Sequence, residues 1–342
     1  MSASIYDVAQ RAGVSIATVS RYLNGSASVS EKKAQAVQEA MEFFQYEPNQ
    51  FARGLMKQAS NMIGVYFPGG RGSVFDSAYN LELLKGIERA LSYQNYSMVL
   101  LDETQGFSQR KCPVPRYLEY VRQKRLDGLI LSGLSDRHVK HEVFQQIMEE
   151  DFPVVYIGKR VHEKGLNVYA QFEQYHVDML ETLRQNGHKK ILMLIYSFHS
   201  YYLPEIEGVI KARMPDISLY PVIINDMEDR RDQLVHAIET YVSGEGCTAA
   251  VPEGIEETHV ILSICAEKHI QVPEQLSILS VEHQQGAGRM CYPKISARFV
   301  PAQSMGSSAA ELLIRYIREG EVAESSVEYN TTYIPRDSIR RL

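Results

Sequence analysis

The chain has 342 residues, which is too long for one ordinary domain. Of these residues 44% are hydrophobic and 23% are charged, as is normal for a globular protein. The net charge is −6, so the chain is not basic throughout. The four widely separated cysteines argue against a disulfide framework or a metal site. The sequence has neither an apolar signal segment nor a run of about 20 apolar residues, so we expect a cytoplasmic protein without membrane contact.

Three helices are predicted near the N-terminus, each preceded by a serine that can cap it. Ser4 is followed by Asp7 at the spacing of a capping box. The three helices follow Ser4, Ser15 and Ser30 and run to about Ala12, Leu23 and Gln45. The first two helices are too short to be stable alone, so they must pack on each other and on the third.

The spacing of Ala9, Gly13 and Val19 is typical of a helix-turn-helix. The small residue allows close approach, the glycine permits a left-handed turn, and the valine fills the angle between the helices. A purely structural three-helix domain is the alternative. The polar side chains of the second helix favour DNA binding, because hydroxyls can bond phosphates and Arg21 can bond guanine.

The N-terminal segment that contains these residues closely resembles the headpiece of the lactose-repressor (LacI/GalR) family. The resemblance covers residues 4–65 and continues more weakly through the rest of the chain. The matching segments are Ile5-Tyr6-Asp7-Val8-Ala9, Ala12-Gly13-Val14-Ser15, Ala17-Thr18-Val19-Ser20-Arg21, Asn24-Gly25, Val29-Ser30-Glu31-Lys32 and Tyr46-Glu47-Pro48-Asn49.

The resemblance implies a role for each matching position on DNA. Ile16, Ala17 and Arg21 lie at base-reading positions. Because Ile16 and Ala17 can contact only a thymine methyl group, Arg21 should carry most of the direct readout. The positions implied to contact phosphates are Tyr6, Ser15, Thr18, Ser20, Asn24 and Ser30.

Residues 49–57 resemble the hinge helix of the family, which implies folding on DNA and contacts from Asn49, Ala52 and Arg53. Leu55 matches the leucine that enters the minor groove and bends the duplex. A plain linker is the alternative, because Gly54 opposes a free helix.

From residue 61 onward, short apolar strands alternate with helices, which predicts parallel sheets covered on both faces. The expected strands are 62–67, 97–101, 128–131, 154–157, 191–195, 219–224, 249–251 and 278–281, and the expected helices are 81–93, 117–124, 139–150, 175–185, 233–242, 257–269 and 303–318. These strands are about twice the number of one doubly wound sheet, so we expect two lobes.

The core resembles the two-lobed, periplasmic-binding-protein-type (type I) Rossmann-like sandwich of the same family. The expected fold class is therefore an all-α helix-turn-helix headpiece joined to an α/β core. The expected divisions are a headpiece at 1–48, a hinge at 49–60 and a core at 61–342. Within the core, lobe 1 should comprise about 61–160 and 293–322, and lobe 2 about 161–292 and 323–342.

Ligands of such cores lie between the lobes at the carboxyl ends of strands. This chain lacks most of the polar pairs that sugar-binding relatives carry there, so an ordinary free sugar is not expected. Three interpretations stay open: another small molecule, control by a protein corepressor, or no regulation. The candidate effector-binding residues are Tyr79, as a stacking ring, with Lys159, Glu205, Glu253 and Glu282 as polar anchors.

No enzyme fingerprint is present, and we expect neither catalysis nor a cofactor. A catalytic or solute-binding α/β protein is the rival class. The sequence predicts a homodimeric transcription regulator, a repressor, on a near-palindromic operator, because a two-fold dimer requires two-fold DNA.

Overall fold

The computed structural model describes residues 4–23, 28–46, 59–67, 74–102, 116–133, 142–159, 162–197, 199–224 and 229–342. The chain divides into two compact units, Met1–Asn61 and Met62–Leu342, which we call the headpiece and the core. Five predicted DNA contacts lie outside the described residues: Asn24, Asn49, Ala52, Arg53 and Leu55.

The headpiece contains α1 (Ile5–Ala12), α2 (Ile16–Leu23) and α3 (Glu31–Phe44), as predicted. The capping box forms at the start of α1: Asp7 N–H donates to Ser4 Oγ over 3.4 Å, and Ser4 N–H donates to Asp7 Oδ2 over 2.7 Å. Gly13 has a φ of 64°, the left-handed conformation that the turn between α1 and α2 requires.

A small apolar cluster holds the three helices together. Its buried members are Val8, Ala9, Val19, Val37 and Ala40. Val14, Leu23, Met41 and Phe44 are half-buried around that cluster. The helices therefore depend on one another, as their lengths require.

Lobe 1 of the core is built on a parallel sheet whose described strands lie in the order β11-β5-β4-β3-β1-β2. The strands are β1 (Met62–Phe67), β2 (Ser97–Asp102), β3 (Gly128–Ser132), β4 (Val154–Ile157), β5 (Leu166–Ala170) and β11 (Ser326–Tyr329). The helices are α5 (Ala78–Tyr93), α6 (Arg116–Arg122), α8 (Glu142–Glu149) and α13 (Ala302–Glu319), with a 3-10 turn at Val74–Asp76.

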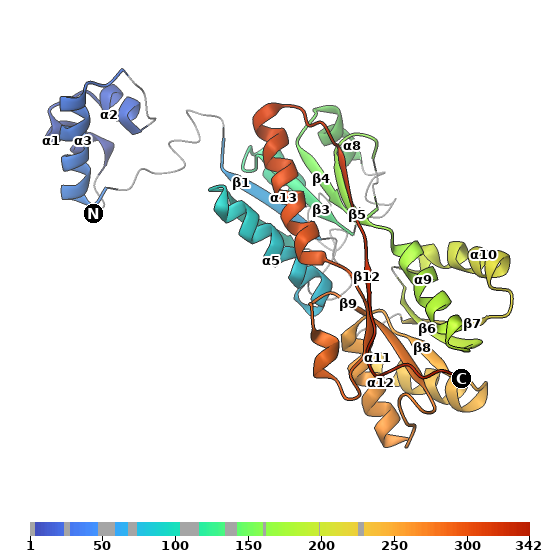
Figure 1. The fold of residues 1–342 in the computed structure, drawn as a ribbon. Coiled ribbons are helices and arrows are strands. Elements are labelled where there is room, and N and C mark those ends of the chain that lie inside the picture. Colours follow the sequence, from blue (N-terminus) through green and yellow to red (C-terminus); the bar gives the residue numbers. More distant parts are fainter. Residues whose placement is uncertain are drawn as a thin grey trace. The chain divides into compact units, whose positions relative to one another are not determined.

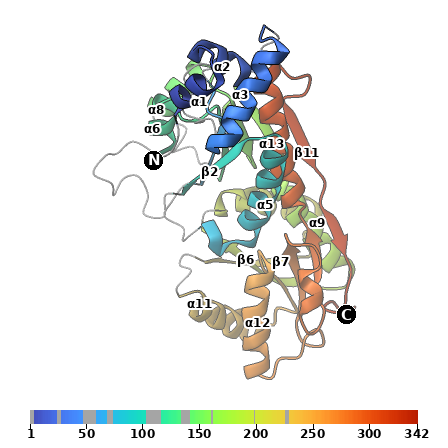
Figure 2. The same ribbon diagram turned by 90° about the vertical axis from the view of Figure 1, so that its left-hand side faces the viewer.

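Lobe 2 repeats this architecture, with described strands in the order β12-β10-β9-β8-β6-β7, of which β12 alone pairs antiparallel. The strands are β6 (Lys190–Tyr196), β7 (Ser218–Ile224), β8 (Ala249–Val251), β9 (Ser277–Glu282), β10 (Ser296–Phe299) and β12 (Thr332–Ile334). The helices are α9 (Phe172–Gln185), α10 (Leu203–Arg213), α11 (Arg230–Ala237) and α12 (Ile255–Glu267), with a π-helical turn at Ile238–Gly244 after α11 and 3-10 turns at Ser200–Tyr202 and Ala287–Met290. Figures 1 and 2 both show α11 beside α12.

The chain passes between the lobes after β5, after β10 and after β11 (Figure 1). Each passage comes later than the sequence predicted, because β5 and β11 belong to the sheet of lobe 1 and β10 to that of lobe 2. The prediction missed β5 since Asn167 interrupts its apolar run. Asn167 is buried, and its N–H donates to Ser325 O over 2.8 Å next to β11.

Helices α5 and α13 pack against each other very closely (Figures 1 and 2). A Cβ placed on Gly86 would lie 1.9 Å from Gln303 O, and one placed on Gly306 would lie 2.2 Å from Leu83 O. Only glycine fits at these two positions, so the two helices form one rigid pair in lobe 1. None of the helices in the described ranges is both long and apolar enough to span a membrane.

Candidate DNA-reading surface and interlobe site

The start of α2 carries two of the predicted phosphate-contacting hydroxyls. Thr18 N–H donates to Ser15 Oγ over 3.2 Å, and the two hydroxyl oxygens lie 2.9 Å apart. Ser15 therefore caps α2 and orders Thr18 beside the helix N-terminus, where the backbone dipole favours an anion.

The predicted base-reading residues are exposed on α2. Ile16, Ala17 and Arg21 all face solvent, whereas Val19 between them is fully buried in the headpiece core. Of the other predicted phosphate contacts, Tyr6 is 68% exposed, Ser30 is exposed, and Thr18 and Ser20 are half-buried. This arrangement lets α2 enter a major groove while its buried face holds the fold.

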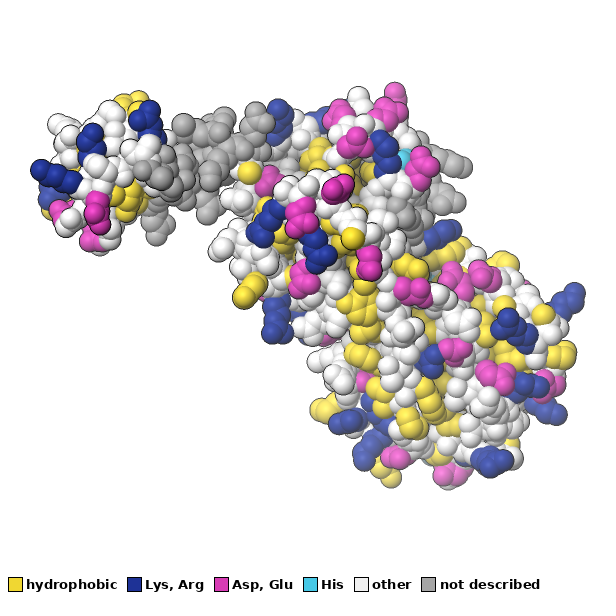
Figure 3. Space-filling model, turned by 45° about the horizontal axis from the view of Figure 1, so that its top comes forward, with side chains coloured by type: hydrophobic (Ala, Val, Ile, Leu, Met, Phe, Trp, Pro, Cys, Tyr) yellow, Lys and Arg dark blue, Asp and Glu magenta, His cyan; other side chains and the backbone are white. Residues whose placement is uncertain are grey.

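One headpiece arginine that the prediction passed over has a structural contact. The Arg11 guanidinium lies 3.3 Å from the centre of the Phe43 ring, which joins α1 to α3 through a cation–π contact. On the face of the core that Figure 3 shows, basic and acidic side chains are interspersed rather than gathered by sign.

A second candidate site lies where the two lobes of the core meet. Tyr79, at the start of α5 in lobe 1, contacts two rings of lobe 2: the ring centres of Phe172 and His283 lie 6.1 and 5.0 Å away. Burial, and secondarily the neighbouring Tyr201, raises the pKa of Tyr79. The ring predicted to stack on a ligand is thus packed between side chains of the protein.

Glu253 follows β8 and is the centre of a hydrogen-bond network in lobe 2. Its carboxylate accepts from Tyr196 N–H over 2.9 Å, from His199 Nδ1 over 3.0 Å and from the Tyr202 hydroxyl. Burial on its own would raise the pKa of Glu253, but the charge of His199 and these hydrogen bonds lower it. Glu253 is therefore a buried, ionised carboxylate that the protein itself satisfies.

His176 lies beneath this network and is 1% exposed. Its Nδ1 lies 2.8 Å from Phe172 O, and since a carbonyl only accepts, Nδ1 must carry the proton. The Tyr175 and Tyr202 rings stack on it at 4.3 and 5.1 Å. Burial is the main cause that lowers the pKa of His176 to about 4, so the ring is neutral.

Glu282 at the end of β9 does not fit the predicted role of ligand anchor. Its side chain is fully buried, forms an ion pair with Arg336 at 2.7 Å, and accepts from the N–H groups of Gly286 and Gly288. The carboxylate is held inside lobe 2 by the protein, which leaves no exposed oxygen for an effector.

The structure does not bring the remaining two predicted anchors into this network. Lys159, after β4, is exposed, and its Nζ lies 5.4 Å from the centre of the Tyr201 ring. Glu205 is exposed in the first turn of α10. Lys159 therefore faces the second lobe, whereas Glu205 lies on the solvent-exposed face of α10.

Sequence reasoning missed the histidines and most of the aromatic rings of the interlobe site. They are Phe172, Tyr175, His176, His199, Tyr202 and His283. The signal available was the density of aromatic and histidine residues in 172–176 and 199–202, where helices begin. Across the described parts of the chain, no group of three or more His, Cys, Asp or Glu side chains is placed to hold a metal ion.

A capped helix-turn-helix with an exposed second helix, followed by a two-lobed parallel α/β core, defines a class of protein: a DNA-binding transcription regulator with a sensor core. Comparisons with known proteins agree. Residues 4–49 match the profile of bacterial regulatory proteins of the lacI family. Residues 73–213 match periplasmic binding proteins and the sugar-binding domain of the LacI family, and 180–339 match a periplasmic binding protein-like domain.

Relatives match over nearly the whole chain. Catabolite control protein A of Staphylococcus xylosus is 26% identical over 96% of both chains, and the ribose operon repressor of Bacillus subtilis is 24% identical over 99% of both. The lac repressor dimer bound to operator has the same fold, with a TM-score of 0.80 at 18% identity over 99% of this chain and 100% of that one. The chain belongs to the LacI family of bacterial regulatory proteins.

Proposed function

We propose that the protein is a repressor that binds a near-palindromic operator as a homodimer, with an affinity that a ligand between the core lobes changes. The observation that carries this proposal is the exposure of Ile16, Ala17 and Arg21 on a helix whose opposite face is buried. The relatives support it, since two of them, both from Bacillus subtilis, bear the name of repressor.

The proposed DNA contacts separate into two groups. Arg21 would read guanine in the major groove, with Ile16 and Ala17 against thymine methyl groups. Tyr6, Ser15, Thr18, Ser20 and Ser30 would bond phosphates and set the register. Asn24, Asn49, Ala52, Arg53 and Leu55 complete the proposed set from the sequence resemblance.

Dimer formation is supported by apolar side chains exposed on lobe 2. Met290 is 86% exposed and its neighbour Tyr292 is 96% exposed, which favours burial against a second copy of the chain. A two-fold dimer would place two headpieces on the half-sites of a palindrome.

The proposed effector site is the interlobe region around Tyr79. One solved structure with the same fold is described as a regulator–cellobiose complex, with a TM-score of 0.67, 19% identity and coverage of 98% of this chain and 99% of that one. Because Glu253 is already satisfied by protein donors, an effector here would contact mainly the aromatic rings, the histidines and Lys159.

The test is fluorescence-anisotropy binding to a palindrome with a central CpG step, with and without sugars, sugar phosphates and nucleobases. Tight, salt-dependent binding and a several-fold shift by one compound would support both parts of the proposal. Absence of palindrome-specific binding would overturn the DNA-reading part. Specific binding that no compound shifts would overturn the effector part.

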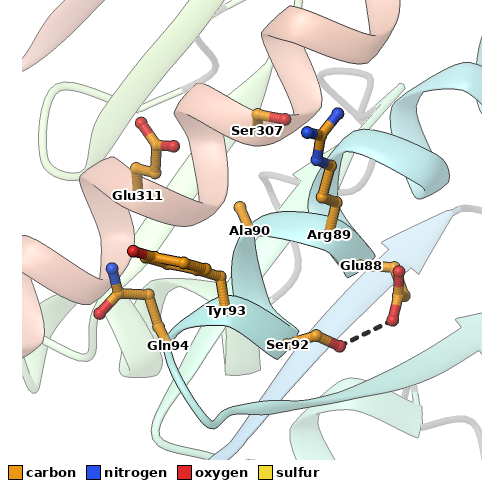
Figure 4. A pocket seen from close by; sticks show the side chains of 8 residues that line it. All are labelled: Glu88, Arg89, Ala90, Ser92, Tyr93, Gln94, Ser307 and Glu311. Carbon is orange, nitrogen blue, oxygen red and sulfur yellow. Dashed lines mark hydrogen bonds between the residues drawn. The ribbon is translucent and has the colours of Figure 1, made fainter.

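A second candidate is control by a protein corepressor, and one surface feature favours it. A groove of about 570 Å³ lies between α5 and α13, where Ala90 and the 86%-exposed Tyr93 face Ser307 and Glu311 (Figure 4). Tyr93→Ala and Glu311→Lys should then abolish repression in cells while the purified protein binds the operator unchanged. Retained repression would reject this candidate.

We also propose that the protein regulates rather than catalyses, because the relatives it matches along its whole length are named as regulators.

A further inference from the structure

The first backbone amide of α5 in lobe 1 is hydrogen-bonded by a side chain from lobe 2. Ala78 N–H donates to Glu256 Oε1 over 3.0 Å, and Glu256 stands in the first turn of α12. Ser77 Oγ accepts from Asn80 N–H at the same helix end. The two acceptors satisfy orphan amides of α5, and a carboxylate is favoured there by the helix dipole.

The next residue of α5 adds an apolar contact between the same two lobes. Tyr79 is packed against Phe172, the first residue of α9, and against His283, which follows β9. These rings lie in the aromatic and histidine cluster of lobe 2 that surrounds Glu253. A hydrogen bond and a ring contact from adjacent residues therefore join the end of one helix to three separate elements of the other lobe.

The neighbouring carboxylates are engaged differently. Glu253 is bonded within lobe 2, and Glu257 forms an ion pair with Arg230 at 2.8 Å and accepts from the Tyr196 hydroxyl. Burial, opposed in part by these contacts, raises the pKa of Glu257. Glu256 is half-buried and points its carboxylate at lobe 1 instead. The α12 N-terminus thus carries two carboxylates that stabilise lobe 2 and one that contacts lobe 1.

The hydrogen bond to Glu256 acts on a helix, α5, that is packed rigidly against a second helix, α13. Helix α5 is interlocked with α13 at Gly86 and Gly306, so a displacement of the start of α5 carries α13 with it. Helix α13 begins at Ala302, directly after the passage from β10.

We propose that Glu256, together with Tyr79, forms a built-in interlobe clasp that holds the α5–α13 pair of lobe 1 against lobe 2 and sets the lobe-to-lobe arrangement. Any effector that changes this arrangement must break or replace the bond from Glu256 to α5. The clasp consists of this chain's own groups, so it goes beyond the proposed function and does not depend on an effector being found.

The test is backbone amide hydrogen exchange, followed by mass spectrometry, on the full chain without DNA or added ligand. In Glu256→Ala the amides at the start of α5 should exchange about tenfold faster, as expected for a lost hydrogen bond to a charged acceptor. Peptides that contain Phe172 and His283 should also exchange faster, because Tyr79 leaves them. Glu256→Gln, which keeps a neutral acceptor, should give a smaller increase.

Glu267→Ala is the matched control. Glu267 lies on the same helix and pairs with Arg231 at 2.6 Å within lobe 2, so its loss should leave all three regions unchanged. Tyr79→Leu should reproduce the faster exchange around Phe172 and His283. If Glu256→Ala affects only the start of α5, Glu256 is a local cap and the clasp is wrong. The clasp is equally wrong if Glu256→Ala exchanges like the wild type.

Discussion

The headpiece and the core use their polar residues in opposite ways. On α2, the predicted base-reading residues Ile16, Ala17 and Arg21 are exposed, and Val19 holds the helix in the headpiece core. In the core, the carboxylates at the carboxyl ends of strands are buried and satisfied by the protein, as with Glu253 and Glu282. Position at a strand end therefore does not by itself identify a ligand anchor. Whether a carboxylate can bind a ligand depends on whether hydrogen-bond donors of the protein already occupy its oxygens.

The largest expected effect tests whether the buried carboxylate of Glu282 stabilises the core. Glu282→Gln leaves Arg336, whose side chain is 6% exposed, without its counter-charge, so the core should lose about 3–5 kcal/mol of unfolding free energy in a urea titration. Glu267→Gln, in an exposed pair, should cost at most about 1 kcal/mol. A Glu282 variant of unchanged stability but altered effector response would instead make Glu282 a ligand anchor.

Arg21 tests the claim that the exposed residues of α2 contact DNA and do not stabilise the fold. Arg21→Ala should weaken operator binding by about 1–3 kcal/mol and relax sequence preference, with unchanged stability because the side chain is exposed. Arg315→Ala, an exposed arginine on α13, is the control and should bind DNA as the wild type does. An equal loss of affinity for every sequence would show that Arg21 contacts phosphate rather than a base.

The buried His176 should make the unfolding free energy of the core depend on pH. Its pKa is about 4 in the folded protein, below the ordinary value of 6.5, so the unfolded chain binds the proton first. The stability that neutral His176 contributes is present above pH 6.5 and is lost as the pH falls from 6.5 towards 4. The core should lose about 2 kcal/mol from this residue between pH 7 and 5.

Replacing His176 measures how much of the stability lost between pH 7 and 5 comes from this side chain. His176→Phe keeps a stacking ring but does not titrate, so its unfolding free energy should fall less between pH 7 and 5 than that of the wild type. Parallel curves for the two proteins would mean that His176 takes up a proton without unfolding the core.

The sequence predicted the headpiece well because its rules are local. The capping box acts over three residues, and Gly13 adopts the φ that its place after α1 requires. Buried apolar runs likewise predicted the central strands of the core. The pairing of Glu282 with Arg336 spans 54 residues, as does that of Glu253 with His199, and no local pattern reveals either. The same reason hid β5, because the backbone N–H of its Asn167 donates to Ser325 beside β11, more than 150 residues further along the chain.

The smallest expected effects separate two serines that precede helices in the headpiece. Ser4 closes a capping box, and its backbone and side-chain hydrogen bonds lower the pKa of Asp7. Ser30 precedes α3 but makes no capping hydrogen bond through its side chain. Ser4→Ala should therefore cost the headpiece about 1 kcal/mol of stability and return the Asp7 pKa towards its usual value, measured by thermal unfolding and NMR titration.

Ser30→Ala should do the reverse, with little loss of headpiece stability and a weaker operator affinity, because its hydroxyl would bond a phosphate. The salt dependence should stay the same, because the hydroxyl carries no charge. Ser4→Ala should leave that affinity nearly unchanged when measured well below the unfolding temperature. Since both substitutions remove one hydroxyl from a helix start, any general effect on the fold is shared. If Ser30→Ala lowered stability as much as Ser4→Ala and left DNA binding intact, Ser30 would be a helix cap and not a phosphate contact.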